Sequence, residues 1–288
     1  MASTASAPLE STPTAAEGGG GGGDGRRSEG PSLRRCMESV GPVVGKAAAC
    51  MTAPSDINEH CPVLMMLASR CDSVIELGVR SGVSFQSIVA GLAVRQEVLR
   101  SLGQTRRLRL TGVDLDDVRG CAGVKATQSS AASVGIPCHV VIKSDLEWDA
   151  AKEHGPVDLT FIDTIHLYGQ LKRELAKYAP LTRKYIAMHD TTVDGVTSEA
   201  IRMRWNVDKV AKNLKMTTRE VRTGLWLAVT EFLRDNGEEW VLSKRYTNNN
   251  GLTILERIGG GGDTGDAAME EAAETSDKTA IGIVKKAS

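Results

Sequence analysis

Hydrophobic and polar positions follow two alternating patterns between Ser55 and Arg257. Short apolar runs fit buried strands, and the longer segments between them carry apolar residues at helical spacing, most clearly over 83–102. The apolar runs are 73–77, 107–113, 138–142, 157–162 and 184–188. Strands that recur with helices between them form βαβ units, so the pattern predicts a parallel sheet with helices on both faces.

The last part of this region changes character. A helical segment at 223–236 precedes two apolar runs, 240–246 and 252–256, which flank Thr247-Asn-Asn-Asn-Gly251. Asn-Gly between two apolar runs is a strong hairpin signal, because both residues tolerate positive φ. The sequence therefore predicts an α/β fold with a doubly wound, mainly parallel sheet that ends in an antiparallel hairpin.

Composition separates a folded region from two tails. All 11 aromatic residues lie between Phe85 and Tyr246, and both ends of the chain carry uninterrupted glycine runs. Segments that lack aromatics and are rich in Gly, Ser, Thr and Ala bury too little apolar surface to offset the entropy of ordering them. We expect disordered tails at 1–35 and 258–288, and one domain at 36–257.

Charge and hydropathy exclude some partners. The chain has 35 basic and 36 acidic side chains, a net charge of −1, which argues against bulk electrostatic capture of nucleic acid or an acidic membrane. The longest apolar stretch, around 88–94, is far shorter than the roughly 18 residues of a membrane span. We expect no membrane partner, and the sequence leaves self-association open.

The N-terminus and the cysteines bear on location. The first residues lack the basic start and apolar run of a secretory signal, and the six cysteines include no CxxC pair. A reducing interior fits this pattern better than a zinc knuckle or a disulfide framework. We expect an intracellular, cytoplasmic protein, although the Ser-, Thr- and Ala-rich start leaves organelle targeting open.

Aspartates gather at the predicted strand ends. In an open parallel sheet, ligands bind beyond the carboxyl ends of the strands. Four of the five predicted parallel strands place an aspartate there, namely Asp114, Asp145, Asp163 and Asp190. Core packing has no need for carboxylates at these positions, so they predict a binding or catalytic edge.

The first strand leads into the loop Glu76-Leu-Gly78-Val-Arg-Ser-Gly82. Glycines here let the backbone turn sharply and approach a ligand at a helix N-terminus, although an ordinary glycine-rich turn has the same pattern. The loop is not the GxGxxG of dinucleotide-binding proteins. Asp114, after the second strand, can accept hydrogen bonds from both hydroxyls of a ribose and would repel a 2′-phosphate.

This loop, followed by Gly112-Val-Asp114, resembles the first two motifs of class I S-adenosylmethionine (SAM)-dependent methyltransferases. The resemblance implies a Rossmann-like sheet of seven strands with a terminal antiparallel hairpin, and SAM as the cofactor. By position it implies these roles: Gly78 and Gly82 beside the methionine part of SAM, Asp114 at the ribose, Asp145 near the adenine, and Glu76 in support of the loop.

The second half of the chain resembles a narrower branch. Phe161-Ile-Asp-Thr-Ile-His166-Leu-Tyr168 and Tyr185-Ile-Ala-Met-His189-Asp190-Thr191 are similar to sugar and antibiotic O-methyltransferases and cephalosporin-hydroxylase-like proteins. Several of these bind a divalent metal at the two strand ends, which implies Asp163 and Asp190 as ligands of a hard cation such as Mg²⁺. Relatives usually have two adjacent acidic or amide groups where this chain has His189 and Asp190, and histidine is a poorer magnesium ligand. Alternatively, Asp190 caps a helix.

His166 is the predicted catalytic base, in company with Asp163. Methyl transfer to a hydroxyl needs a group that takes the proton, and the unperturbed pKa of histidine, near 6.5, suits this role. The three-residue spacing places both side chains on one loop above the fourth strand. The alternative is a residue at a helix start that hydrogen bonds to the backbone.

Two further segments have two interpretations each. Ser55 or Asp56 caps a helix, with Glu59 completing a capping box if Asp56 caps, or the segment folds over the cofactor as a lid. Residues 202–222 contain seven basic and two acidic side chains, with apolar residues at helical spacing. They predict a solvated amphipathic helix or a surface for an acidic substrate, and the scarcity of aromatics argues against nucleic acid.

Together, these patterns predict an enzyme, a SAM-dependent methyltransferase that O-methylates a small molecule or saccharide, with or without a divalent metal. Two alternatives stay open. One is a non-catalytic cofactor-binding or scaffold protein of the same fold. The other is an NAD-linked oxidoreductase, against which the absent GxGxxG and the antiparallel end argue.

Overall fold

The computed structural model describes residues 33–259, in which seven strands form one sheet with the order β3-β2-β1-β4-β5-β7-β6. The strands are β1 Ser73–Leu77, β2 Arg109–Asp114, β3 Cys138–Ile142, β4 Val157–Ile162, β5 Thr182–His189, β6 Trp240–Tyr246 and β7 Leu252–Arg257. β7 runs antiparallel to β5 and β6, and the pairs among β1 to β5 are parallel. This confirms the predicted doubly wound sheet and its terminal hairpin, which is the fold that the methyltransferase resemblance implies.

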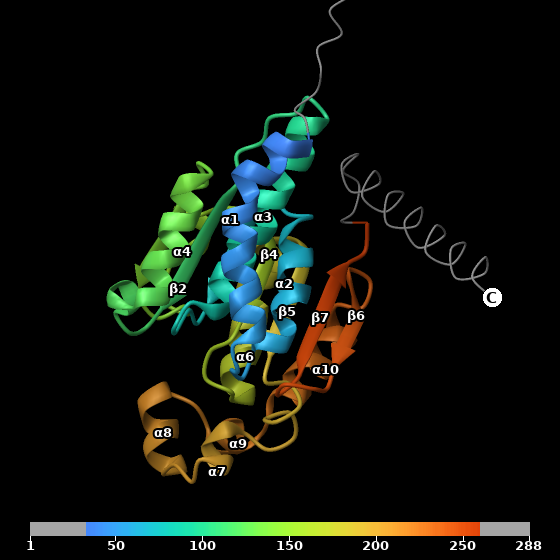
Figure 1. Cartoon of the computed structure of the whole chain (residues 1–288). Coiled ribbons are helices and arrows are strands. Elements are labelled where there is room, and N and C mark those ends of the chain that lie inside the picture. The colour runs from blue at the N-terminus through green and yellow to red at the C-terminus, as the bar shows by residue number, and fades with distance from the viewer. Residues whose placement is uncertain (1–32, 260–288) are drawn as a thin grey trace, which may run out of the picture. The chain divides into compact units, whose positions relative to one another are not determined.

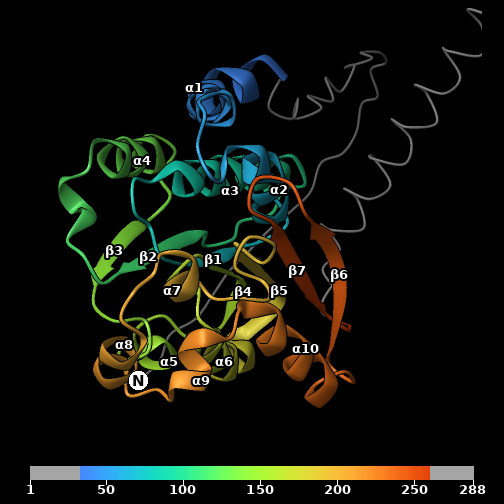
Figure 2. The ribbon, with the colours of Figure 1, turned by 90° about the horizontal axis from the view of Figure 1, so that it is seen from below.

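Helices cover both faces of the sheet (Figure 2). They are α1 Leu33–Thr52, α2 Cys61–Ala68, α3 Val83–Ser101, α4 Ala122–Ser133, α5 Ala150–Glu153, α6 Tyr168–Tyr178, α7 Glu199–Arg202, α8 Val207–Leu214, α9 Thr218–Arg222 and α10 Leu225–Asp235. α2, α3 and α4 cover one face, with α1 packed outside them, and α5, α6 and α10 cover the other. α7, α8 and α9 form a separate group beyond the carboxyl ends of the parallel strands (Figure 1).

The central strands β1 and β4 are buried along their whole length, because helices exclude water from both faces. Side chains alternate between the two apolar clusters: Val74 belongs to the cluster under α3, and Ile75 and Leu77 belong to the cluster that includes α6 and α10. Glu76 is the acidic residue of β1, between the apolar Ile75 and Leu77. Its side chain shares the α3 face with Val74.

Two sequence predictions concern the ends of the chain and the membrane. The predicted tails lie mostly outside the described residues, since α1 begins at Leu33 and β7 ends at Arg257. Among residues 33–259, no helix combines the length and the apolar character that crossing a membrane requires.

Candidate active site

The glycine loop turns tightly against the end of β4. Gly78 and Gly82 have φ of 85° and 86°, a region that favours glycine. A Cβ placed on Gly78 would lie 2.0 Å from the carbonyl oxygen of Asp163. Glycine at position 78 therefore lets the loop pack directly beside the strand end that carries Asp163.

Asp114 holds this loop in place. Its Oδ2 accepts hydrogen bonds from the backbone N–H groups of Val79 and Arg80, both at 2.9 Å, and its Oδ1 accepts one from Asp116 at 2.9 Å. A carboxylate offers about four acceptor positions, so one remains. A ribose that uses both hydroxyls would have to displace one backbone donor. The ribose role of Asp114 stays a prediction.

Glu76 lies fully buried beneath the loop. Its Oε1 accepts a hydrogen bond from the Ser84 hydroxyl at 2.5 Å, whereas Oε2 has no partner. Burial raises the pKa of Glu76 well above its usual range, and the carboxylates of Asp163 and Asp114 raise it further. An unpartnered buried oxygen is costly unless a ligand donor or a proton satisfies it.

Asp145 has internal partners. Gln170 Nε2 on α6 lies 3.3 and 3.2 Å from its two carboxylate oxygens and also donates to Glu174 at 2.9 Å. Burial raises the pKa of both Asp145 and Glu174. The Asp145 side chain therefore belongs to a polar cluster with α6, and its contact with adenine stays a prediction.

The structure brings His166, His189, Asp163 and Asp190 together at the ends of β4 and β5. Asp190 Oδ2 lies 3.0 Å from both His166 Nε2 and His189 Nδ1. Asp163 Oδ1 lies 3.6 Å from His166 Nε2 and 3.3 Å from His189 Nδ1. His166 therefore faces carboxylates and is no backbone-bonded helix start, and Asp190 precedes a turn and caps no helix.

The charges in this cluster are strongly coupled. Burial opposes protonation of both imidazoles, but hydrogen bonds to the carboxylates outweigh it and raise the pKa of His166 to about 12 and that of His189 to about 10. Burial likewise opposes ionisation of Asp163 and Asp190, yet the histidines hold their pKa values below the usual range. Without a bound cation, two imidazolium ions balance two carboxylates.

Asp194 and Arg202 are site residues that the sequence analysis did not assign. Asp194 is fully buried, and its Oδ2 accepts from His166 Nδ1 at 2.9 Å. Arg202 donates to both Asp194 oxygens at 2.7 Å. The available signal was a second aspartate four residues after Asp190, in the same loop.

A cavity of about 340 Å³ opens beside this cluster. It is lined by Asp56, Arg80, Asp163, Thr164, His166, Asp190, Glu199, Arg202, Met203 and Asn250. Arg80 and Asp190 have positive φ, 48° and 57°, a conformation that costs non-glycine residues about 1–3 kcal/mol each and tends to occur at functional sites. The carboxyl edge of the sheet thus combines a cavity, strained backbone and coupled charges.

The segment before α2 lies at the rim of this cavity. The predicted capping box is wrong: α2 follows the short 3₁₀ turn η1 Asn58–His60, and neither element has a side-chain N-cap. Asp56 instead pairs with Arg80 of the glycine loop at 2.7 Å. Asn249 Nδ2, in the hairpin turn, donates to the carbonyl of Ser55 at 3.0 Å. These contacts tie the segment to two parts of the site.

The basic segment is helical, but the structure divides it into the short helices α8 and α9, where the sequence predicts a single amphipathic helix. α8 buries Val207 and Ala211 against Leu167 and Val221, and its lysines lie on the exposed side. Binding of an acidic substrate to this basic surface stays a prediction. Arg202 is the basic residue of the segment that reaches the cavity.

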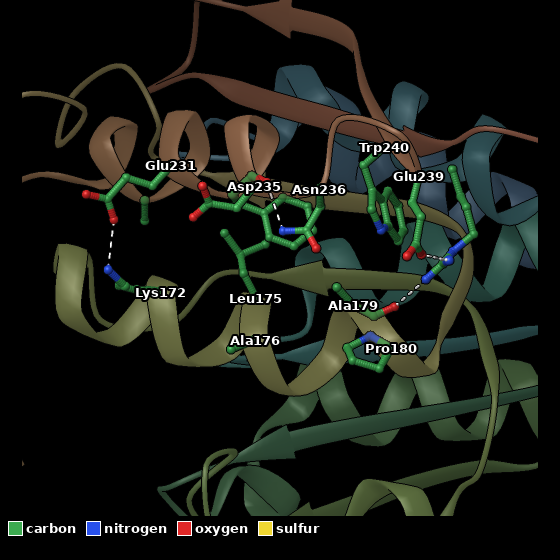
Figure 3. Close-up of a pocket in the computed structure, with 13 residues that line it drawn as sticks. Lys172, Leu175, Ala176, Ala179, Pro180, Glu231, Asp235, Asn236, Glu239 and Trp240 are labelled. Carbon is green, nitrogen blue, oxygen red and sulfur yellow. Dashed lines mark hydrogen bonds and ion pairs between the residues drawn. The ribbon is translucent and has the colours of Figure 1, made fainter.

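A second cavity, of about 350 Å³, lies between α6 and α10, outside this cluster (Figure 3). Its floor is apolar, with Leu175 and Trp240, and its acidic residues are paired, as in the Lys172–Glu231 contact of 2.8 Å. Among residues 33–259, those that line it include no histidine, cysteine or hydroxyl side chain. The histidines that face buried carboxylates lie at the carboxyl edge instead.

Comparisons with known proteins give structural neighbours. No protein-family model and no curated protein matches the sequence. A protein from Corynebacterium glutamicum is 16% identical, with a TM-score of 0.45, over 78% of this chain and 95% of that one. An O-methyltransferase from Bacillus cereus in complex with SAH, the demethylated product of SAM, is 11% identical, with a TM-score of 0.42, over 76% of this chain and 90% of that one. The tomaymycin-synthesis O-methyltransferase of Streptomyces achromogenes in complex with SAM is 14% identical, with a TM-score of 0.43, over 75% and 89%.

Proposed function

We propose that the chain is a SAM-dependent methyltransferase that transfers a methyl group to a hydroxyl of a small molecule or saccharide. One observation carries the proposal. At the carboxyl edge of the sheet, a glycine loop lies above a buried Glu76 whose Oε2 has no partner, and beside the loop a cavity is lined by a histidine held between carboxylates.

The residues around the loop fit SAM. The free Oε2 of Glu76 can accept from the positively charged amino group of the methionine part, and Asp114 retains an acceptor for a ribose hydroxyl. Gly78 keeps the space beside Asp163 free of a side chain. SAM, when bound, supplies a methyl group on a sulfonium, which a nucleophile displaces in line.

The acid–histidine cluster fits a divalent cation. Asp163 and Asp190 offer oxygen ligands, and His189 offers a nitrogen, with all three donor atoms within 4.8 Å of one another. A cation there would lower the pKa of the acceptor hydroxyl and replace the positive charge that the two imidazolium protons now supply. The proposed methyltransferase therefore uses Mg²⁺ or another divalent ion at this cluster.

His166 is the proposed base. Its Nδ1 donates to Asp194, whose position Arg202 maintains through two hydrogen bonds. This contact aims Nε2 at Asp190 and the cavity, in the manner of an acid–base histidine oriented by a buried aspartate. A bound cation would displace the proton that Nε2 carries in its absence, and an acceptor hydroxyl in the cavity can then pass its proton to Nε2.

A thermal-shift panel of the full chain with SAM, its demethylated product SAH, NAD and Mg²⁺ tests the cofactor. Ligand at 100 times its dissociation constant stabilises a fold by about 2.7 kcal/mol, which raises Tm by roughly 5 to 11 °C at this size. We expect that shift with SAM and SAH. A shift with NAD alone would overturn the proposal in favour of the oxidoreductase alternative.

Matched variants locate the cofactor, and a product assay tests turnover. Asp114→Asn should weaken SAM binding about tenfold or more, because it removes a charged acceptor. Asp117→Asn, an exposed neighbour that pairs with Arg119, should leave SAM binding unchanged. Labelled-methyl transfer to a panel of hydroxyl acceptors then separates an enzyme from a scaffold, which would bind SAM without product.

A further inference from the structure

We infer that His189 Nδ1 is a third ligand of the cation at Asp163 and Asp190, and that the site therefore prefers a first-row transition dication, such as Mn²⁺, Fe²⁺, Co²⁺ or Zn²⁺, to Mg²⁺. This inference rests on the cation of the proposed function and adds its ligand set and chemical class.

The donor spacing matches a shared ion. His189 Nδ1 lies 3.0 Å from Asp190 Oδ2 and 3.3 Å from Asp163 Oδ1. Ligands about 2.1 Å from one metal stand about 3.0 Å apart in octahedral and about 3.4 Å apart in tetrahedral geometry. The side chains of His189, Asp190 and Asp163 are 0%, 3% and 5% exposed, so little water competes for these donors.

The hairpin turn orients the imidazole. His189 Nε2 lies 3.1 Å from the backbone carbonyl of Asn249, so this nitrogen donates its hydrogen there and Nδ1 faces the carboxylates. Metal-binding histidines usually donate their second nitrogen to such an acceptor, which fixes the ring. The turn itself is anchored, because Asn249 Nδ2 donates to Ser55.

His166 does not share this arrangement. Its Nδ1 is engaged by the fully buried Asp194 at 2.9 Å, and its Nε2 lies 3.6 Å from Asp163 Oδ1, farther than the 3.3 Å that separates His189 Nδ1 from the same oxygen. It therefore keeps its role beside the metal, and His189 provides the single nitrogen ligand.

A nitrogen ligand changes the preferred ion. Imidazole suits transition dications, whereas Mg²⁺ demands oxygen ligands and retains water. Replacing one oxygen ligand by His189 Nδ1 therefore weakens Mg²⁺ binding relative to binding of Mn²⁺ or Co²⁺. A single residue, His189, directly before Asp190, thus accounts for the preference for transition dications.

Pulsed EPR of bound Mn²⁺ tests the ligand. The full chain, treated with EDTA and reloaded with Mn²⁺, should show ¹⁴N coupling from one directly bound imidazole. His189→Asp should abolish that coupling and lower the ratio of Co²⁺ to Mg²⁺ affinity, measured by calorimetry, about tenfold or more. His189→Asn serves as a second variant if the added carboxylate prevents folding, as judged by circular dichroism.

His60→Gln is the matched control. His60 is buried, lies 5.6 Å from the His189 ring between centroids, and contacts the same Asn249 carbonyl at 3.2 Å, but it faces no carboxylate of the cluster. This variant should keep the ¹⁴N coupling and the metal preference. The test thus separates coordination by His189 from a general disturbance of this region.

The outcomes are distinct. Bound Mn²⁺ without ¹⁴N coupling, or coupling that survives in both His189 variants, overturns the inference and leaves a cation site made of oxygen ligands. Binding of no dication overturns both the inference and the metal part of the proposed function. A SAM-induced thermal shift in the same metal-free sample would leave the methyltransferase proposal intact.

Discussion

Replacing Gly78 by alanine tests whether the glycine loop must lie against the end of β4. Gly78 has φ of 85°, and an alanine Cβ there would lie 2.0 Å from the carbonyl oxygen of Asp163 and 2.7 Å from its carbonyl carbon. Both are backbone atoms, so no side-chain rotation relieves the contact. The loop or the strand end must move.

The structure sets the size of the effect. A left-handed conformation costs an L-residue about 1–2 kcal/mol, and overpacking in a tight site typically costs about 1–3 kcal/mol. Gly78→Ala should therefore lower the free energy of unfolding by about 2–5 kcal/mol. Gly103→Ala is the control, because Gly103 has φ of 68° with no atom within 4 Å of its Cβ position. It should show the conformational cost alone.

Urea unfolding followed by circular dichroism measures both variants, and calorimetry measures SAM binding. We expect Gly78→Ala to be more destabilising than Gly103→Ala by about 1–3 kcal/mol, the packing contribution. SAM binding should be lost in Gly78→Ala and kept in Gly103→Ala. Equal destabilisation, or unchanged SAM affinity in Gly78→Ala, would refute the close approach of loop and strand.

Three further changes have defined outcomes. Burial lowers the pKa of His154 to about 4, so the folded state holds this histidine neutral. The unfolded chain takes up a proton there near pH 6.5. The contribution of His154 to the free energy of unfolding is therefore present above pH 6.5 and is lost as pH falls from about 6.5 through about 4. His154→Gln should remove up to about 3 kcal/mol of the acid-induced loss of stability, and an unchanged pH dependence of unfolding between pH 7 and 4 would contradict this. Asp194→Asn should slow single-turnover methyl transfer about 100-fold with SAM affinity unchanged, because it weakens the orientation of His166; an equal loss of SAM affinity would argue for a structural role. Asp56→Asn should raise the susceptibility of the segment before α2 to limited proteolysis, since it weakens the 2.7 Å pair with Arg80, and an unchanged cleavage rate would show that the hairpin contacts suffice.

The strands and the hairpin could be predicted from the sequence because their signals are local. The predicted runs at 73–77, 138–142 and 157–162 coincide with β1, β3 and β4. β5 spans Thr182–His189, beyond the predicted 184–188, since pairing with β4 includes Thr182 at its start and pairing with β7 includes His189 at its end. Apolar periodicity and an Asn-Gly turn reflect burial and backbone conformation within a few residues.

Strand-end position also singled out Asp163, His166 and Asp190 as neighbours. Parallel strands end at one edge, so residues that follow adjacent strands meet there whatever their separation in sequence. The contacts of Asp194 with His166 and of Arg202 with Asp194 could not be predicted, because they depend on how the long connection after β5 folds back onto the site. No local pattern encodes that path.

The order of strands and helices, the glycine loop and the identity of the polar groups at the carboxyl edge could be predicted from the amino-acid sequence, because these depend on periodicity and residue type. Which atoms these polar groups face depends on the packing of the folded chain. This packing directs Asp114 to the loop backbone, Asp145 to α6, and the two imidazoles to one pair of carboxylates. Hydrogen bonds and charge coupling act over about 3 Å, and only the packed chain brings such atoms within that distance.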